Sequence, residues 1–382
     1  MPNIQQVFYQ SYCGYLDKYG MNYELDKVAK AIMGCKTPAM GGNQTICQDC
    51  GKTHLHYNSC KNRHCPCCQS LTKEKWIDAQ KADVVDAPYF HAVFTVPEEL
   101  NPLIYSNKSA LYNLLYRASS ETLMDLARDK KHLGADIGFI SILHTWGSNL
   151  SFHPHIHAIV LGGGLSKNGR FLTANKKFLF PIKVVSKLFR GKFLDGLKKL
   201  YLKKALSLPG DMAILEHPSE FNQFLTKLYT TEWIPYIKEP FKCADHVIEY
   251  LGRYTHRIAI SNSRILEVGE KSVTFRVKDY KTGTHKTLTL QNEEFIRRFL
   301  MHVLPKRFVK IRHYGLLSNR TKSKKLKLIR ILIKGKVQKP ILKDLTALEI
   351  LKQLYGIDTT ICRYCGSSNI QRKSLTSVKK IE

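Results

Sequence analysis

Residues 153–157, His-Pro-His-Ile-His, carry the side chains best suited to bind a metal ion. They run directly into an apolar stretch, 158–161, that three glycines close, and such a short apolar run predicts a buried β-strand. Because side chains alternate along a strand, His155 and His157 project from one face while Ile156 turns to the other. Two neighbouring imidazoles form half of a metal site. Incidental histidines at a strand end are the other interpretation of this pattern.

Cysteines gather between residues 47 and 68 at the spacing of a zinc module. Two Cys-x-x-Cys pairs have the knuckle spacing that holds tetrahedral zinc: Cys47 with Cys50, and Cys65 with Cys68. Such a zinc is structural, because four thiolates leave no open position for a substrate, and it supplies folding energy to a short segment. Three more potential ligands stand among these pairs: Cys60, His64 and Cys67. They build a second site, or Cys60 and His64 replace one of the favoured pairs.

Other cysteines lie outside this segment. Cys35 is close enough in sequence to serve as a reserve ligand, whereas Cys13 has no assignment. Cys362 and Cys365 form half of a zinc site, which recruits ligands from elsewhere in the chain or from a second subunit, or stays reduced.

Tyr250 and Tyr254 are the candidate nucleophiles. Their spacing places both phenols on one helix face, one turn apart, and His246 falls one turn earlier on that face. Arg253 and Arg257 give the row a cationic setting. Core packing is the ordinary alternative for a tyrosine pair at this spacing. Because it shares the tyrosine face, His246 is the candidate third ligand for a metal on the two strand histidines.

The elements that must position these groups follow from hydrophobic periodicity. His144 falls in a strand that pairs with the histidine strand. We expect it to be packed or hydrogen-bonded rather than a ligand, and a place near the site is the alternative. Alternating strands and helices of this kind predict an α+β fold with an antiparallel sheet. The expected elements are helices before residue 40, over 109–130 and from 181, strands over 90–96, 137–146 and 155–161, and a hairpin over 271–290. Residues 321–343 are Lys-rich and are expected to be flexible or in contact with DNA.

Charge indicates the partner. The 382 residues include 60 Lys and Arg against 31 Asp and Glu, a formal net charge of +29 that is spread along the chain. A polyanion, and above all a nucleic acid, is the natural partner. The sequence has no apolar run long enough to span a bilayer and no apparent signal segment. A cytosolic location follows, where the 11 cysteines are reduced and better suited to bind metal than to form disulfides. No phosphate-binding loop occurs, which argues against a nucleotide motor.

The order of these segments resembles one family, the two-tyrosine HUH transposases of bacterial insertion sequences, which move by a rolling-circle-like route. The resemblance covers roughly residues 35–320. It rests on the zinc segment 47–68, Phe94-Thr-Val-Pro97, His155-Ile-His157, Tyr250-Leu-Gly-Arg-Tyr254-Thr-His-Arg257, Val273-Thr-Phe-Arg276, Glu294-Phe-Ile-Arg-Arg-Phe299 and Arg312-His-Tyr-Gly-Leu-Leu-Ser-Asn319. It implies an HUH endonuclease domain, an antiparallel sheet flanked by helices, with an N-terminal zinc-binding domain and a basic C-terminal region. The expected parts are a helical and zinc-binding domain over 1–80, a nuclease domain over 85–265 with a basic helical insertion around 165–240, a hairpin and helical DNA-binding part over 266–330, and a basic tail with Cys-x-x-Cys over 331–382.

The resemblance also implies the chemistry. A tyrosine attacks the DNA phosphodiester with the help of Mg²⁺ or Mn²⁺ and leaves a 5′-phosphotyrosine and a free 3′-hydroxyl, so that rejoining needs no ATP. The substrate is single-stranded DNA of the element ends and target site, because the phosphate must enter a groove. The expected setting is the bacterial cytoplasm, close to the nucleoid. The expected phosphate contacts are Arg253, His256, Arg257, Lys310 and Arg312.

Two other functions fit part of the pattern. A plasmid replication initiator or relaxase of the HUH class would share the histidines and tyrosines, although the zinc segment and the stretch after Tyr254 favour a transposase. A non-enzymatic, zinc-dependent DNA-binding regulator would explain the charge and the cysteines but would leave His155, His157 and the two tyrosines idle. A tyrosine recombinase is disfavoured because no His-x-x-Arg box occurs. A transposase that uses an Asp/Asp/Glu triad is also disfavoured, because no evident set of these three acidic residues stands on predicted strands.

Overall fold

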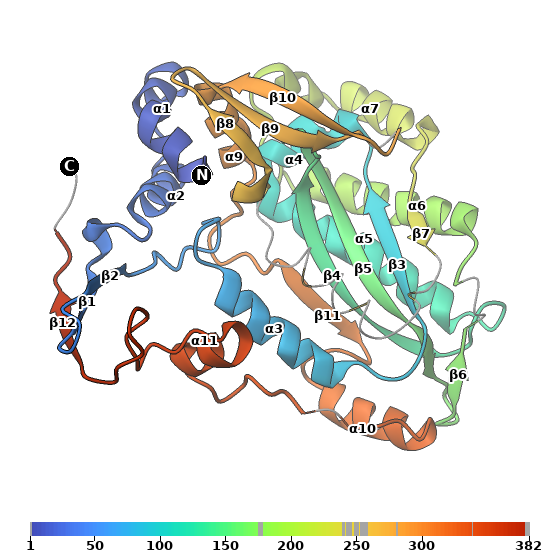
Figure 1. The fold of residues 1–382 in the computed structure, drawn as a ribbon. Coiled ribbons are helices and arrows are strands. Elements are labelled where there is room, and N and C mark those ends of the chain that lie inside the picture. The colour runs from blue at the N-terminus through green and yellow to red at the C-terminus, as the bar shows by residue number, and fades with distance from the viewer. Residues whose placement is uncertain are drawn as a thin grey trace.

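A central antiparallel sheet organises the computed structural model, which describes residues 2–174, 179–238, 241, 247, 252, 259–279, 282–337 and 339–378 (Figure 1). Its strands run in the order β11-β4-β5-β3-β7, and β6 pairs with the far end of β5. The strand bounds are β3 Tyr89–Thr95, β4 Asp136–Trp146, β5 Phe152–Leu165, β6 Phe171–Thr173, β7 Tyr236–Lys238 and β11 Ile311–Gly315. The two longest strands, β4 and β5, lie at its centre and pair antiparallel, with His144 opposite His155.

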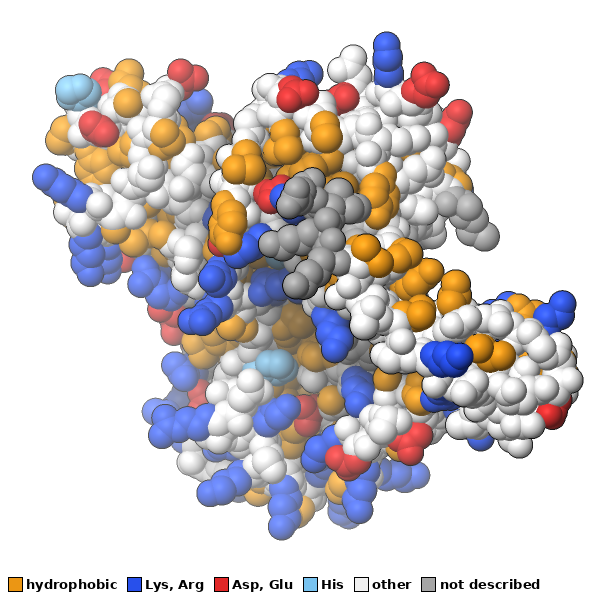
Figure 2. All heavy atoms as spheres, turned by 90° about the vertical axis from the view of Figure 1, so that its left-hand side faces the viewer, with side chains coloured by type: hydrophobic (Ala, Val, Ile, Leu, Met, Phe, Trp, Pro, Cys, Tyr) orange, Lys and Arg blue, Asp and Glu red, His pale blue; other side chains and the backbone are white. Residues whose placement is uncertain are grey.

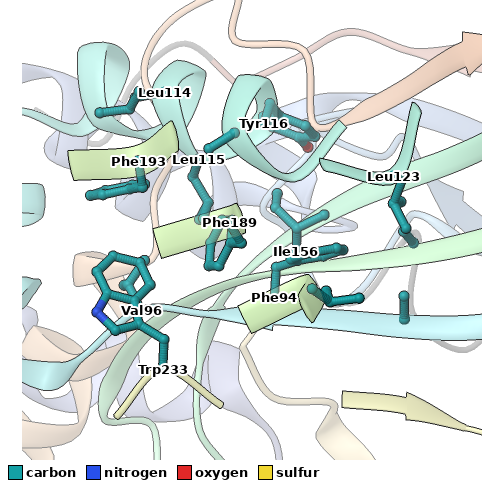
Figure 3. Close-up of a cluster of buried hydrophobic side chains, with 14 of the residues drawn as sticks. Phe94, Val96, Leu114, Leu115, Tyr116, Leu123, Ile156, Phe189, Phe193 and Trp233 are labelled. Atoms are coloured by element: carbon teal, nitrogen blue, oxygen red, sulfur yellow. The ribbon is translucent and has the colours of Figure 1, made fainter. Parts of the chain in front are cut away.

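Three long helices cover one face of this sheet: α5 (Lys108–Arg128), α6 (Ile182–Leu202) and α7 (Pro218–Thr230). Because side chains alternate along β5, Ile156, Ala158 and Val160 point to this side and pack under the helices. Figure 3 shows Phe94 and Ile156 of the sheet meeting Phe189 of α6. The basic insertion therefore contributes an apolar helix face to the main core, and its Lys192 pairs with Glu121 and Asp125 of α5.

The opposite face carries the even-numbered side chains of β4 and the odd-numbered ones of β5. Ile140, Ile142 and Ile159 lie there in a smaller cluster with Leu326 and Ile329. The last two belong to α10 (Lys322–Leu332), and α3 (Ser70–Asp83) crosses the same side of the sheet in Figure 1. This face also receives the histidines.

A second core joins the first helices to a later hairpin. Helices α1 (Ile4–Tyr19) and α2 (Tyr23–Gly34) pack with α9 (Asn292–Met301). A three-stranded antiparallel sheet completes this unit: β8 (Ile265–Val268), β9 (Ser272–Lys278) and β10 (His285–Gln291). Phe8 meets Phe299 edge to face, with 5.5 Å between ring centroids. Residues 4–35 and 259–303 therefore contribute to one hydrophobic unit.

A third small sheet brings distant parts of the chain together. Its strand order is β12-β1-β2, from Ile370–Leu375, Gly42–Cys47 and Thr53–Tyr57. Helix α11 (Ala347–Tyr355) precedes β12, and Figure 1 shows β12 running beside β1 at the edge of the molecule. Short elements complete the fold: η1 Pro38–Met40, η2 Glu98–Leu100, α4 Asn101–Ser106, η3 Gly210–Glu216 and η4 Asn262–Arg264.

The α+β class with an antiparallel sheet is confirmed, and the predicted strands and long helices agree with β3, β4, β5 and α5 to within a few residues at each end. The predicted hairpin is β9 with β10. One alternative offered for the Lys-rich stretch, flexibility, is wrong for 322–332. That part is a helix, because its Leu326 and Ile329 are buried against the sheet. Among the described helices, none combines the length and apolar character needed to cross a membrane.

Candidate metal centres

Three histidines converge at the centre of the main sheet. His144 of β4 and His155 and His157 of β5 bring one ring nitrogen each to within 4.8 Å of one another. The antiparallel register explains this grouping, because His144 lies directly opposite His155 and diagonal to His157. All three ligand groups are buried, and His155 keeps partial exposure only as a whole residue.

Hydrogen bonds set the orientation of two of these rings. The Nδ1 of His155 lies 2.6 Å from the backbone oxygen of His153, to which it donates, so its Nε2 carries the lone pair. The Nδ1 of His157 lies 2.8 Å from Nε2 of His91 on β3. The two Nε2 atoms of His155 and His157 then face each other at 2.9 Å. Adjacent nitrogen ligands of an octahedral divalent ion are about 3 Å apart, so the spacing of this pair is compatible with one divalent ion and does not select which.

Burial keeps these imidazoles in the form that binds metal. Loss of solvent lowers the pKa of His155 to about 3 and drives the pKa of His157 well below its ordinary value. The same cause lowers the pKa of His91 to about 3. Neutral rings at physiological pH need no proton loss before they ligate a cation.

An aromatic ring and a cation lie beside the trio. The ring of Trp146 stacks on His144 with 4.6 Å between centroids, and Nζ of Lys310 lies 5.0 Å from the Trp146 centroid. Burial lowers the pKa of Lys310 to about 7. Arg312, opposite Ser141, turns instead to the helix-covered face, where it donates to the side-chain oxygen of Asn113 of α5 at 2.6 Å and its guanidinium lies 4.0 Å from the Tyr116 centroid. The roles of Lys310 and Arg312 on DNA stay predictions.

The candidate nucleophiles fall outside the described residues. This holds for Tyr250 and Tyr254, and also for His246, Arg253, His256 and Arg257. Two residues of that part of the chain are described. Val247 is buried with Ile140 and Ile159 on the histidine-bearing face, and Gly252 lies against Ile77 of α3.

His144 is the site residue that sequence reasoning named as an alternative near the site but did not expect as a ligand. No histidine stands two residues before or after it, so alternation along its own strand does not mark it as a metal ligand. The signal was the pairing of the two strands, which brings residue 144 opposite residue 155. His144 is packed, as predicted, but it also joins the group of potential ligands.

The first cluster of thiols joins Cys60, Cys65 and Cys68 to Cys35, at the end of α2. The sulfurs of Cys60 and Cys68 are 3.8 Å apart, and two of the four residues are buried. Tetrahedral zinc with four thiolates places neighbouring sulfurs about 3.8 Å apart, so the donor set fits zinc. The reserve ligand Cys35 thus lies within the cluster, while Cys67 is not grouped with these four.

The favoured zinc set was wrong in its pairing. Cys47 and Cys50 do not lie with Cys65 and Cys68; they lie with Cys362 and Cys365, because β1 pairs with β12. His64 belongs to neither thiol group among the described residues. It is a buried histidine whose Nε2 accepts the backbone N–H of Leu304 at 3.1 Å. Two Cys-x-x-Cys pairs fix two half-sites, but their spacing carries no information on which halves meet.

Lysine and arginine side chains are spread widely over the surface. Figure 2 shows them over much of one face, with fewer acidic side chains among them. The distribution agrees with the net charge of +29. A surface of this kind attracts phosphate backbones without regard to base sequence.

Comparison with known proteins identifies the family. A family model described as "Putative transposase" matches residues 138–325, which include the three grouped histidines. A second, described as a transposase zinc-binding domain of the IS91 type, matches residues 7–96, which include the first thiol cluster. No solved structure matches the chain.

Two relatives span most of the chain. "Putative transposase y4qJ" of Sinorhizobium fredii is 44% identical over 316 residues, which are 82% of this chain and 79% of the relative. The transposase for insertion sequence element IS801 of Pseudomonas savastanoi pv. phaseolicola is 26% identical over 373 residues, 97% of this chain and 88% of the relative. The resemblance inferred from the motifs is confirmed: the chain belongs to the transposases of IS91- and IS801-type insertion sequences and carries their zinc-binding domain.

Proposed function

We propose that this transposase nicks and rejoins single-stranded DNA at insertion-sequence ends through a 5′-phosphotyrosine intermediate. The observation that carries the proposal is the convergence of His144, His155 and His157 on the central strands. Three neutral imidazoles suit a catalytic cation better than a structural one, because they leave coordination positions for a phosphate. When bound, Mg²⁺ or Mn²⁺ would act as a Lewis acid on the scissile phosphate.

The chain's own residues do the remaining chemistry. The phenol oxygen of Tyr250 or Tyr254 attacks phosphorus and forms the new P–O bond, while the bond to the 3′-oxygen breaks. The phenol proton passes to a base or to water, and the leaving 3′-oxygen gains a proton to become a hydroxyl. The reverse attack by a 3′-hydroxyl restores the phosphodiester, so neither step consumes ATP. Two tyrosines allow one DNA end to stay attached while a second is cut.

The position of Val247 and Gly252 supports this assignment. Both lie on the histidine-bearing side of the sheet, and Tyr250 stands between them in sequence. With His144 available as the third protein ligand, the proposed catalytic set is His144, His155 and His157, and His246 becomes an additional candidate rather than a necessary one.

Zinc has a separate, structural role in this proposal. Cys35, Cys60, Cys65 and Cys68 would hold it within the matched zinc-binding domain. The loop between these cysteines docks on the nuclease part, since Arg63 donates to the backbone oxygen of Phe308 at 2.8 Å. The zinc-binding domain would thus support the sheet edge that carries Lys310 and Arg312.

The deciding experiment is cleavage of labelled single-stranded DNA that carries the element's own end, with Mn²⁺ or Mg²⁺. Wild type should form a protein–DNA adduct that survives denaturant. The double variant Tyr250→Phe/Tyr254→Phe should form none, and His155→Ala should lose metal-dependent cleavage. Tyr236→Phe, an exposed tyrosine on the edge strand β7, is the matched control and should retain the adduct.

Two outcomes would reject the proposal. Full cleavage by the double tyrosine variant would exclude a phosphotyrosine. Tight DNA binding without an adduct, on several end sequences, would favour the zinc-dependent DNA-binding regulator. A replication initiator or relaxase would instead cleave replication-origin or transfer-origin DNA in preference to the element's ends.

A further inference from the structure

A second cluster of thiols joins two parts of the chain more than 300 residues apart. The Sγ atoms of Cys47 and Cys365 are 3.6 Å apart, and those of Cys50 and Cys362 are 3.7 Å apart. All four sulfurs lie within 4.8 Å of one another. Cys362 and Cys365 fall beyond both segments matched by family models, 7–96 and 138–325. We name this cluster the four-thiol clasp.

The two halves of the clasp have the same backbone structure. In each, a glycine follows the second cysteine in the left-handed region, Gly51 at φ 66° and Gly366 at φ 77°. In each, that glycine's N–H bonds to the first cysteine's carbonyl, at 3.0 Å for Gly51 and 2.8 Å for Gly366. The first cysteine's N–H then bonds to a carbonyl five residues on, Lys52 for Cys47 and Ser367 for Cys362. Two unrelated segments have therefore folded into the same Cys-x-x-Cys-Gly turn.

The sulfur spacing fits a tetrahedral metal. Zinc bound by four thiolates at about 2.3 Å places neighbouring sulfurs about 3.8 Å apart, close to both measured distances. A disulfide would bring two sulfurs to about 2 Å, and the observed separations are far longer. Cys47 and Cys362 are buried while Cys50 and Cys365 are exposed, so the site is shielded on one side only.

We propose that Cys47, Cys50, Cys362 and Cys365 bind one structural Zn²⁺, distinct from the zinc held by Cys35, Cys60, Cys65 and Cys68. The proposal does not depend on the nuclease mechanism. Zinc is favoured over other cations because soft thiolates and a closed tetrahedral donor set leave no position for water or substrate. Binding releases the thiol protons to solvent.

The clasp holds a segment that has little core of its own. Within 339–378 the buried apolar side chains are Leu342, Ile350 and Cys362. One end of this segment is fixed on α3: the N–H of Leu342 donates to Asp78 at 2.7 Å, and Lys75 donates to the carbonyl of Leu345 at 2.6 Å. The other end pairs as β12 with β1 and reaches the clasp. The zinc would therefore hold residues 339–378 across α3, on the histidine-bearing side of the sheet.

Zinc stoichiometry tests the proposal directly. Full-length protein, purified with a reductant and without chelator, should carry two zinc ions per chain by native mass spectrometry. Cys362→Ser/Cys365→Ser should carry one, whereas Cys13→Ser, an exposed thiol of α1, should keep two. One zinc in wild type that persists in the double variant would overturn the proposal. A wild-type mass with one zinc that lies two hydrogen atoms, about 2 Da, below the value for reduced remaining thiols would also overturn it, since that marks a disulfide in place of the metal.

A second readout separates the clasp from general misfolding. Limited trypsin digestion of the double variant should cut within 339–378 while residues before 335 stay resistant, and a zinc chelator should produce the same early cut in wild type. Equal resistance of this segment in both proteins, with and without chelator, would contradict a structural metal at the clasp.

Discussion

His91 determines which nitrogen of His157 faces the other two imidazoles. Its Nε2 lies 2.8 Å from Nδ1 of His157, and the two rings stack with 5.1 Å between centroids. With a metal bound, donation from Nδ1 of His157 to His91 would leave Nε2 of His157 as the metal-binding atom. His91 itself is not one of the three grouped histidines, so it is a positioning residue. Partners of this kind orient the ring and tune its basicity.

Removal of His91 should weaken metal binding without removing a ligand. We expect His91→Ala to lower the affinity for Mn²⁺ by about 10- to 100-fold. The measurement is a titration of Mn²⁺ followed by its electron paramagnetic resonance signal, with thermal unfolding measured separately because His91 is buried. His91→Gln retains an acceptor and should recover part of the affinity. His56→Ala, an exposed histidine of β2, is the control, and an equal loss there would refute the role.

For individual site residues, the sequence predicted groupings only within one strand or within one Cys-x-x-Cys knuckle. His155 and His157 were predicted together because alternation is a property of a single strand. His144 joined them only through the β4–β5 register, which depends on turn geometry and core packing. Cys65 and Cys68 are likewise close because of their spacing. Cys35 joins them only because α2 ends beside the loop that carries Cys60, Cys65 and Cys68.

At the scale of the elements, a substitution at the end of β11 tests how rigidly this edge strand is held against β4. Gly315 has a φ of 57°, and an added Cβ would lie 1.9 Å from the carbonyl oxygen of Ile137 on β4. We expect Gly315→Ala to lower the free energy of unfolding by more than about 2 kcal/mol, since it combines a left-handed backbone with a backbone clash.

The matched control is a glycine in open space. Gly191 lies inside α6 with no atom within 4 Å of an added Cβ, so Gly191→Ala should raise the free energy of unfolding by about 0.5–1 kcal/mol. Chemical denaturation of both variants checks the pair. A neutral effect at position 315 would show that the β11 edge can shift.

Helix α9 carries an ion-pair network with a defined pH dependence. Hydrogen bonds from Arg297 and then Arg298 lower the pKa of Glu294 to about 2, and its carboxylate oxygens lie 2.7 Å from Nε of each. A lowered pKa in the folded state gives stability that is fully present above pH 4.5 and lost as the pH falls through 2. Because the groups are partly exposed, the contribution is less than about 1 kcal/mol.

Glu294→Gln isolates this contribution. The variant should be less stable than wild type at pH 7, and the difference should shrink between pH 4.5 and pH 2 as the wild-type carboxylate gains a proton. Urea unfolding at pH 7, 5 and 3.5 checks the trend. A difference that grows on acidification would mean that burial, not pairing, dominates at this carboxylate.

At the scale of the whole molecule, the topology of the chain determines which distant segments meet, and residue spacing does not. The α+β class and the order of its elements follow from periodicity, which is local. The meeting of β1 with β12, and of α1 with α9, links residues hundreds of positions apart. Such contacts depend on which apolar faces are left uncovered once every element has formed, and so the partner of the Cys47/Cys50 knuckle was not predictable from its own sequence.

The net charge of the whole molecule predicts how DNA binding depends on salt concentration. With a net charge of +29, binding of single-stranded DNA should be driven by release of counterions from its phosphates. Contact with about five phosphates predicts a slope of about −3.5 for log affinity against log salt, a loss of about a hundredfold between 50 and 200 mM. Fluorescence anisotropy with labelled oligothymidylate, without divalent metal so that no cleavage occurs, measures the slope. A neutral-backbone oligomer of the same bases should bind far more weakly. An affinity that changed less than about threefold over this range would mean that base stacking, rather than charge, holds the DNA.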